Sequence, residues 1–347
     1  MEDIYNYTLE ELTKFCQAAD YPRFLAQQVF NWIYRRRLED FILMTNVSKD
    51  ARKFLEDNFF FPRLKSLKKE ESSDGTVKFL FGLSDGAAIE SVYIPERERF
   101  TLCLSTQVGC KYACKFCASG RDGFQRNLAA SEIINQYLSV SKDLNSKVTN
   151  IVFMGIGEPL DNLPNLIKAI QIFLEPKGLG FGKNKICVST SGIIPGIREF
   201  AAASLGVKLS VSLHAAEDGT RTKIMPVNKK YPLKELIAVV KEFSLGQKRS
   251  VMFEYALIKG FNDSLRDAAA LGKLIKGFDA KVNLINCNSS FEGFEPSPDE
   301  AIVEFTQELK KRGIFYFLRK SRGGDINAAC GQLKAKFEKP NQGFRST

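Results

Sequence analysis

Three cysteines lie within one short stretch of the chain, Cys110-Lys111-Tyr112-Ala113-Cys114-Lys115-Phe116-Cys117, in a C-x3-C-x2-C spacing. Thiolates are the usual protein ligands of iron–sulfur clusters, and a cubane cluster normally takes four of them. Three nearby cysteines without a fourth therefore leave one iron open for another ligand. A structural zinc loop is the alternative, but it would use a fourth Cys or His. Residues 118–125 contain neither, and the only histidine of the chain is His214.

The spacing of these cysteines, with the aromatic Phe116 just before the last one, resembles the signature of the radical S-adenosylmethionine (SAM) enzymes. In that family, three thiolates hold a 4Fe–4S cluster. SAM binds the open iron through its amino and carboxylate groups. The resemblance implies that Cys110, Cys114 and Cys117 are the metal ligands and that SAM is a cofactor.

Composition limits the possible classes of protein. At 347 residues the chain has room for about two domains, or for one barrel with an added module. A single histidine excludes a multi-histidine metal site and leaves only His214 for a Ser-His or Cys-His catalytic pair. The chain has 50 Lys and Arg against 40 Asp and Glu, a net charge of +10. This charge suits a polyanionic partner, although a merely basic soluble enzyme is an equal alternative.

The sequence predicts a cytoplasmic protein without membrane contact. No apolar run approaches the roughly 18 residues of a membrane span. The first five residues are acidic and lack the basic start of a signal peptide. Eight cysteines are too few for a secreted disulfide scaffold. A reducing compartment also suits an oxygen-sensitive cluster.

Residues 1–95 are expected to form an N-terminal accessory module that binds RNA. A helical pattern places Leu25, Val29, Trp32 and Ile33 on one face. The arginines at 35–37 close this pattern. They could contact phosphates, or could simply stabilise the C-terminus of a helix. Runs at 77–81 and 87–94 around an Asp-Gly turn predict a β-hairpin.

Residues 96–330 alternate between strand-like and helical runs, and residues 331–347 form a tail. Strand-like runs lie at 102–105, 148–154, 186–190, 207–213, 251–257, 282–285 and 314–318. Helical patterns lie at 131–144, 163–174, 195–203, 232–244, 264–276 and 298–312. Six β/α repeats predict an α/β fold, a partial (βα)6 TIM-like barrel with a parallel sheet. The functional residues of such barrels lie on the loops after the carboxyl ends of the strands, where the cysteine loop is found.

The second predicted barrel strand leads into Gly155-Ile156-Gly157-Glu158-Pro159. Glycine lets the backbone approach a ligand closely, and a carboxylate can accept hydrogen bonds from an ammonium group. The radical SAM resemblance implies that Gly157 and Glu158 hold the amino group of SAM. Alone, the same element would fit an ordinary strand-to-helix turn.

Further polar groups stand at the ends of later strands and could bind the ribose or the carboxylate of SAM. Each of them could equally be a cap or a satisfied turn residue. The candidate SAM-binding residues at these strand ends are Ser189, Ser212, His214 and Asn288, together with the apolar Leu213 between Ser212 and His214.

Two more cysteines extend the resemblance to essentially the whole chain. Cys103 lies seven residues before Cys110, and Cys330 lies within Ala-Ala-Cys-Gly-Gln-Leu at 328–333. Together with the cluster motif, these segments resemble the ribosomal RNA adenine C2 methyltransferases, a bacterial radical SAM family that also acts on transfer RNA. The resemblance implies methylation of C2 of an adenine in 23S ribosomal RNA and in transfer RNA. It also implies a monomer that takes electrons from a donor such as flavodoxin or ferredoxin.

The resemblance further implies a relay through Cys330, because C2 of adenine is electron-poor and cannot be methylated by direct displacement on SAM. Cys330 takes a methyl group from one SAM, and a second SAM yields a 5′-deoxyadenosyl radical that abstracts hydrogen from that methyl. The resulting carbon adds to C2, so that the nucleotide is covalently attached to the enzyme. Glu90 accepts a proton from the base, and Cys103 releases the product by forming a disulfide with Cys330. Without the resemblance, Glu90 would be read as an outward-facing strand residue.

The chain departs from the family pattern at three places. Ile156 stands where Met is common, Asn286-Cys287-Asn288 replaces a more usual Pro-Trp-Asn, and Gly324 replaces a second Asp.

Two other functions compete with this one. A resistance-type relative methylates adenine at C8, but it has Gly-Glu-Ala where this chain has Gly-Glu-Pro. A cluster-stabilised RNA-binding protein without catalysis would give no role to Glu158 or Cys330.

Overall fold

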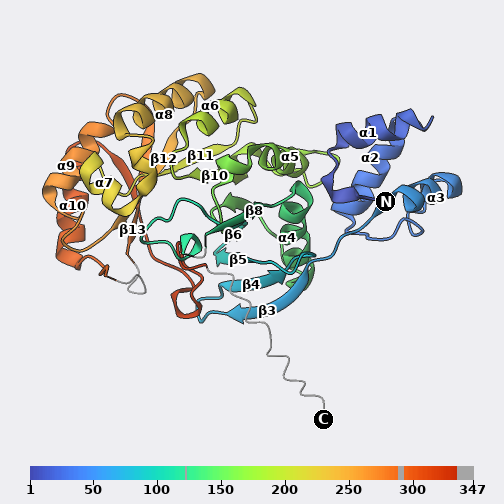
Figure 1. The fold of residues 1–347 in the computed structure, drawn as a ribbon, viewed down its shortest axis with the longest axis horizontal. Coiled ribbons are helices and arrows are strands. Elements are labelled where there is room, and N and C mark those ends of the chain that lie inside the picture. Colours follow the sequence, from blue (N-terminus) through green and yellow to red (C-terminus); the bar gives the residue numbers. More distant parts are fainter. Residues whose placement is uncertain (122, 288–292, 334–347) are drawn as a thin grey trace, which may run out of the picture.

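The fold is built on a parallel sheet curled into a partial barrel, as the sequence predicts (Figure 1). The structure is a computed structural model that describes residues 1–121, 123–287 and 293–333. Its neighbouring parallel strands are, in order, β6 (Arg99–Cys103), β9 (Asn150–Phe153), β10 (Ile186–Thr190), β11 (Lys208–Ser212), β12 (Val251–Leu257), β13 (Ala280–Asn286) and β14 (Phe315–Arg319). Their sequences are rich in β-branched and aromatic residues, which favour strands.

Helices cover the outer face of this sheet (Figure 1). They are α4 (Ala130–Asp143), α5 (Leu163–Leu174), α6 (Ile194–Ala202), α7 (Asp218–Ile224), α8 (Leu233–Gln247), α9 (Leu265–Leu274) and α10 (Asp299–Lys311). The order of strands and helices confirms the predicted α/β fold with a partial barrel. Among the described residues, none of the helices is both long enough and apolar enough to cross a bilayer.

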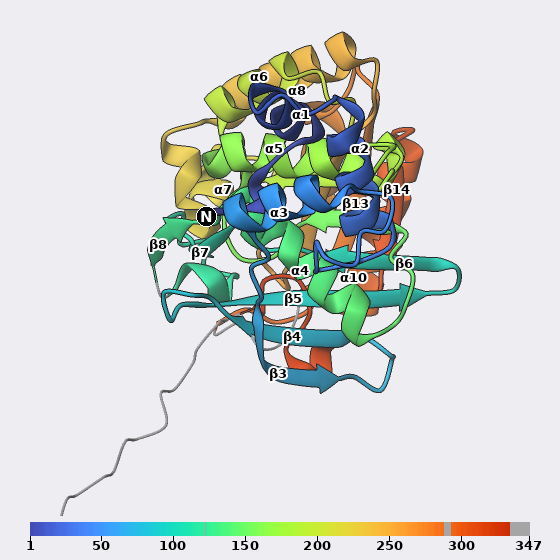
Figure 2. The same cartoon turned by 90° about the vertical axis from the view of Figure 1, so that its right-hand side faces the viewer.

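Three antiparallel strands extend the barrel sheet beyond β6 (Figure 2). They are β3 (Lys65–Glu71), β4 (Val77–Gly82) and β5 (Ala88–Glu96). The β4–β5 hairpin turns at Asp85-Gly86, where the predicted hairpin was expected to turn, and Gly86 has φ +84°. The sheet therefore runs across the boundary expected at residue 95, and these strands belong structurally to the barrel.

The helices α1 (Leu9–Ala18), α2 (Phe24–Phe30) and α3 (Lys49–Asn58) lie at one end of the molecule, next to α4 and α5 (Figure 1). The predicted apolar face is buried at Leu25, Val29 and Ile33, and Trp32 packs beside it.

Two of the three arginines at 35–37 attach this module to the barrel. Arg35 Nε donates to the Gly178 carbonyl at 3.2 Å, and Arg37 Nη1 donates to the Ser141 carbonyl at 3.1 Å. The guanidinium of Arg36 lies 4.1 Å from the centre of the Trp32 ring. Two of the three side chains therefore serve the interface within the chain.

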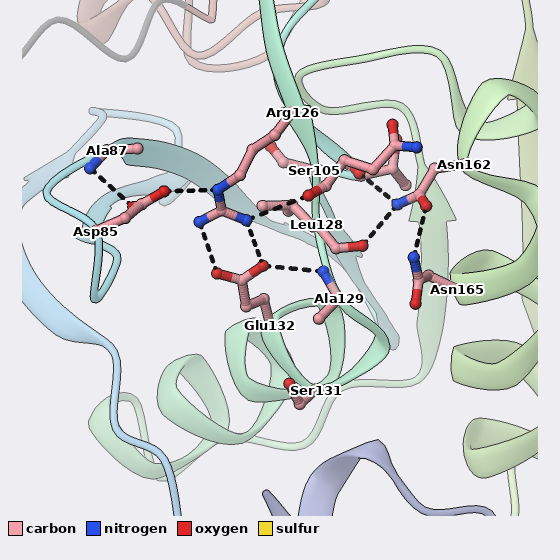
Figure 3. Close-up of polar contacts among 12 residues, drawn as sticks. Asp85, Ala87, Ser105, Arg126, Leu128, Ala129, Ser131, Glu132, Asn162 and Asn165 are labelled. Carbon is pink, nitrogen blue, oxygen red and sulfur yellow. Dashed lines mark hydrogen bonds and ion pairs between the residues drawn. The ribbon is translucent and has the colours of Figure 1, made fainter.

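The cysteine loop lies between two short antiparallel strands, β7 (Gln107–Gly109) and β8 (Phe124–Asn127). Arg126 on β8 ties the returning end of the loop to two other elements (Figure 3). Its Nε lies 2.6 Å from Asp85 Oδ2 in the β4–β5 turn, and its Nη1 lies 2.8 Å from Glu132 Oε2 in α4. The guanidinium lowers the pKa of Asp85 by hydrogen bonding to it.

Asn162 joins the start of the loop to its end (Figure 3). Its buried Nδ2 donates to the Thr106 carbonyl at 2.8 Å and to the Leu128 carbonyl at 2.7 Å. The two segments that flank the cysteine loop are thus held by one amide from the turn that follows Glu158.

Replacing Arg126 with Met should lower the free energy of unfolding by about 1–3 kcal/mol, because two carboxylates lose a charged partner that is only 33% exposed. The Lys14→Met control removes an exposed pair with Glu10, which water and salt screen, and should cost clearly less. Urea unfolding measures both changes, provided that the slope of the unfolding free energy against urea concentration is the same in each protein. Equal losses in the two variants would contradict a structural role for Arg126.

Candidate active site

The carboxyl ends of the barrel strands surround a cavity of about 170 Å³. This is the position where barrels of this kind bind their ligands. The predicted site residues that line it are Cys110, Cys114, Cys117, Gly157, Glu158, Ser189, Ser212, His214 and Cys330. The structure thus brings together groups from five separate segments of the chain.

Backbone contacts hold the cysteine loop in its conformation. The Cys110 amide donates to the Gly123 carbonyl at 3.0 Å, and the Lys115 amide donates to the Ile224 carbonyl at 2.9 Å. Gly109 has φ +73°, and a Cβ there would lie 1.8 Å from the Gly123 oxygen. The close approach at the base of the loop therefore requires glycine.

The three thiols fit an iron–sulfur cluster better than a single metal ion. Within the described residues, no group of three His, Cys, Asp or Glu side chains converges on one point that an ion could occupy. In a cubane each thiolate binds a different iron, so the sulfurs need not converge. Burial raises the pKa of Cys110 to about 12, so a cluster held by this thiol would displace its proton.

Glu158 presents a buried carboxylate to the cavity, with 3% of the residue exposed. Its Oε2 accepts from the Ser191 amide at 2.7 Å and from Ser191 Oγ at 2.8 Å. Burial raises the pKa of Glu158, and the hydrogen bonds from Ser191 oppose that rise. Gly157 has φ +106°, and a Cβ there would lie 2.5 Å from the Cβ of Gln107. This turn can therefore pass close to the cysteine loop and aim a carboxylate at an ammonium group.

His214 is a neutral hydrogen-bond donor toward the cavity. Its Nδ1 accepts from the Ala256 amide at 3.0 Å, so in the neutral ring the proton is on Nε2. Burial, together with the nearby Arg221 charge, lowers the pKa of His214 to about 3. The ring centre lies 4.5 Å from that of Phe116 in the cysteine loop. His214 is therefore suited to orient a ligand oxygen and not to exchange protons near neutral pH.

Arg221 is a fully buried arginine that the sequence analysis missed. Its guanidinium donates to the Ser191 carbonyl at 2.7 Å, the Ser212 carbonyl at 3.0 Å and the Leu213 carbonyl at 3.1 Å. Burial lowers the pKa of Arg221 to about 10, so it remains charged near neutral pH. It fixes the ends of β10 and β11. The expected SAM-binding residue Leu213 is buried there, with its carbonyl bound to Arg221, and does not line the cavity.

Cys330 lies between the main cavity and a second cavity of about 50 Å³. Cys103 and Arg319 also line this second space. Burial, with a further contribution from Cys330, raises the pKa of Cys103 to about 12. Both cysteines are free thiols, and Cys330 is the exposed one. The structure therefore brings the two predicted cysteines to one small cavity.

Glu90 is a buried residue of β5, with 4% exposed, and does not face outward. Alternate residues of a strand share a face, so Glu90 shares one with Val92, which is paired with Cys103 on β6. Its Oε1 lies 3.6 Å from Lys78 Nζ. Lys78, like Arg221, is a residue that the sequence analysis missed. Asn288, the remaining predicted SAM-binding residue, lies outside the described residues.

Comparison with known proteins agrees with this site. Residues 2–60 match the family model described as the ribosomal RNA large subunit methyltransferase N-terminal domain, and residues 104–271 match that of the radical SAM superfamily. A dual-specificity RNA methyltransferase RlmN of Geotalea uraniireducens (strain Rf4) is 45% identical over 339 residues, which cover 97% of this chain and 98% of that protein. The RlmN of Campylobacter curvus (strain 525.92) is 43% identical over 356 residues, covering 97% and 95%.

A crystal structure of a radical SAM methyltransferase from Sphaerobacter thermophilus has a TM-score of 0.90 and 40% identity, covering 97% of this chain and 100% of that one. The match spans the N-terminal helices, the extended sheet and the barrel together. The chain therefore belongs to the RlmN family of dual-specificity RNA methyltransferases, a family of radical SAM enzymes.

Proposed function

We propose that this chain methylates C2 of an adenine in 23S ribosomal RNA and in transfer RNA, with Cys330 carrying the methyl group to the base. The observation that carries this proposal is the position of Cys330 between the main cavity and the one that Cys103 lines. The Gly157-Glu158-Pro159 element and the RlmN relatives favour C2 over C8.

Cys110, Cys114 and Cys117 would hold the 4Fe–4S cluster. When bound, the cluster supplies the electron that cleaves SAM to a 5′-deoxyadenosyl radical, the agent that abstracts hydrogen. The Glu158 carboxylate would accept from the amino group of SAM, as its placement beside the cysteine loop allows. The Nε2 proton of His214 and the hydroxyls of Ser189 and Ser212 would orient its other polar groups, because all three residues line the cavity.

Cys330, Glu90 and Cys103 carry out the remaining steps of the proposed reaction. Cys330 accepts a methyl group by displacement at SAM, which requires its thiolate. Once hydrogen has been removed from that methyl group, its carbon bonds to C2 and attaches the RNA to the enzyme. Glu90 accepts the proton of C2. The electron that radical addition leaves on the adduct would be taken up by the cluster. The Cys103 thiolate then bonds to the Cys330 sulfur while the sulfur–carbon bond breaks, and the released carbon takes a proton, which gives the methyl group on the adenine and a Cys103–Cys330 disulfide.

The partners follow from the same proposal. Sequence-specific RNA recognition favours single-stranded loops, and a base within a duplex would first have to be flipped out. We infer that the target adenine is unpaired, or becomes so on binding, and that the net charge of +10 aids its capture. An electron donor such as flavodoxin or ferredoxin would serve a monomer acting in the cytoplasm.

Replacing any one of Cys110, Cys114 and Cys117 with Ala should abolish the visible absorbance of the cluster in the reconstituted protein, because each thiolate binds a separate iron. The matched control is Cys16→Ala, since Cys16 is buried in the N-terminal helices, away from the cysteine loop. It should keep the full spectrum. Full 4Fe–4S absorbance in the Cys114→Ala protein would refute the ligand assignment.

Cys103→Ala protein should accumulate covalently attached to RNA, because the bond to C2 forms but cannot be resolved. Cys330→Ala protein and the double variant should carry no RNA, because the bond never forms. Denaturing gels with and without ribonuclease, followed by mass spectrometry of the Cys330 peptide, measure this. RNA attached to the Cys330→Ala protein, or a methyl group found on Cys103 alone, would reverse the two roles.

A further inference from the structure

A row of side chains crosses the extended sheet and faces residues 323–333, which carry Cys330 and are called the Cys330 segment below. Lys78 on β4 is paired with Val92 on β5, and Val92 is paired with Cys103 on β6. Paired residues of neighbouring strands point to the same face of a sheet. Glu90 precedes Val92 by two residues and shares that face. Lys78 and Glu90 therefore lie on the side of the sheet where Cys103 lines a cavity with Cys330.

The ammonium group of Lys78 is buried, with 8% of the residue exposed, and it contacts three oxygens. Its Nζ donates to the Ile326 carbonyl at 2.7 Å and lies 3.2 Å from Glu70 Oε2 and 3.6 Å from Glu90 Oε1. The contact with Ile326 is a hydrogen bond, and the contacts with Glu70 and Glu90 are ion pairs, so the ammonium charge faces both carboxylates. Lys78 thus joins Glu90 to a residue four positions before Cys330.

The Cys330 segment is also held at points that do not involve Lys78. In the β3–β4 turn, Ser72 Oγ donates to Asp325 Oδ1 at 2.6 Å and Asp74 Oδ2 accepts from the Gly323 amide at 3.0 Å. On the other side, the Ala118 amide donates to the Gly331 carbonyl at 2.6 Å. Removal of Lys78 would therefore leave the segment attached at both ends.

Without Lys78, Glu90 would lose the buried positive charge that lies 3.6 Å from its Oε1, while the carboxylate of Glu70 would remain nearby. A buried carboxylate that loses an opposite charge and stays near a like charge responds by turning away or by taking a proton. Either response would disable Glu90 as a proton acceptor. The charge on Lys78 therefore matters for Glu90, whereas its bond to Ile326 is one of several that hold the segment.

We propose that Lys78 is a positioning residue that holds the Glu90 carboxylate ready beside the seated Cys330 segment. The inference rests on the proposed role of Glu90 as proton acceptor. Lys78 acts late in the reaction, after Cys330 has received its methyl group. Its loss should therefore separate the two methylation events, sparing the first and slowing the second.

The test compares Lys78→Met and Lys78→Arg with the wild-type holoenzyme in single turnovers with SAM and RNA. Lys78→Met should keep the cluster absorbance and keep methylation of Cys330 within about twofold, while RNA methylation falls roughly 10- to 100-fold, part of what a positioned base contributes. Lys78→Arg restores the charge and should recover much of the loss. Mass spectrometry of the Cys330 peptide and of the RNA nucleosides gives both readouts.

Lys68→Met is the matched control, because Lys68 Nζ lies 2.8 Å from Glu70 Oε1 and contacts the same carboxylate. No contact of Lys68 with Glu90 or with the Cys330 segment occurs among the described residues. This variant should methylate RNA as the wild type does. In a Glu90→Gln background, adding Lys78→Met should cause no further loss, because the two residues act as one unit.

Full RNA methylation by Lys78→Met would overturn the proposal. So would a parallel fall in Cys330 methylation without recovery in Lys78→Arg, since Lys78 would then only hold the fold. If Lys78→Met loses the cluster absorbance, Lys78→Gln takes its place with the same expected results, because Gln keeps a donor for Ile326. A wild-type enzyme that methylates RNA but never carries a methyl group on Cys330 would instead overturn the proposed function, and this inference with it.

Discussion

One backbone hydrogen bond, from the Ala118 amide to the Gly331 carbonyl at 2.6 Å, joins the loop of the three cysteines to the segment of Cys330. The proposed reaction depends on this junction, because a thiol that receives a methyl group from SAM must then deliver it to a base within the same site. Ser119 Oγ adds a bond to the Leu333 carbonyl at 2.9 Å on the same side. A small apolar cluster, which includes Val92, Cys103 and Leu333, packs the segment against the extended sheet. The segment therefore lies between the cysteine loop on one side and the extended sheet, which carries Cys103, on the other.

The added strands β3, β4 and β5 form the part of the sheet against which the Cys330 segment packs. β3, β4 and β5 continue the barrel sheet past β6, so Cys103 lies on a strand shared by the barrel and its extension. Buried polar groups then fix the loops around the cavity. Arg221 satisfies three carbonyls at the ends of β10 and β11, and Asn162 satisfies two beside the cysteine loop. Such groups are stabilising only when their hydrogen bonds are complete, which ties the shape of the site to the packing of the whole barrel.

The barrel and the cluster loop could be predicted from the sequence because their signals are local. Apolar runs mark the buried parallel strands, and the cysteine spacing lies within one loop. β3 was missed because its sequence, Lys-Ser-Leu-Lys-Lys-Glu-Glu, is that of a charged edge strand without an apolar run. Arg221 and Lys78 were missed because a basic residue is normally exposed, and nothing beside either one in the sequence reveals the distant carbonyls and carboxylates that it binds. Leu213 was proposed to bind SAM because it lies at a strand end between Ser212 and His214, and its carbonyl accepts a hydrogen bond from Arg221.

The central claim is that the methyl group reaches the adenine by way of Cys330, and isotope transfer tests it most directly. The enzyme is first incubated with SAM that carries a deuterated methyl group, then freed of that SAM and mixed with unlabelled SAM and RNA for one turnover. If Cys330 is the carrier, the new methyl group on the adenine will contain deuterium, and the 5′-deoxyadenosine formed in that turnover will also have gained it. An unlabelled methyl group on the adenine, with the deuterium still on the protein, would contradict the account.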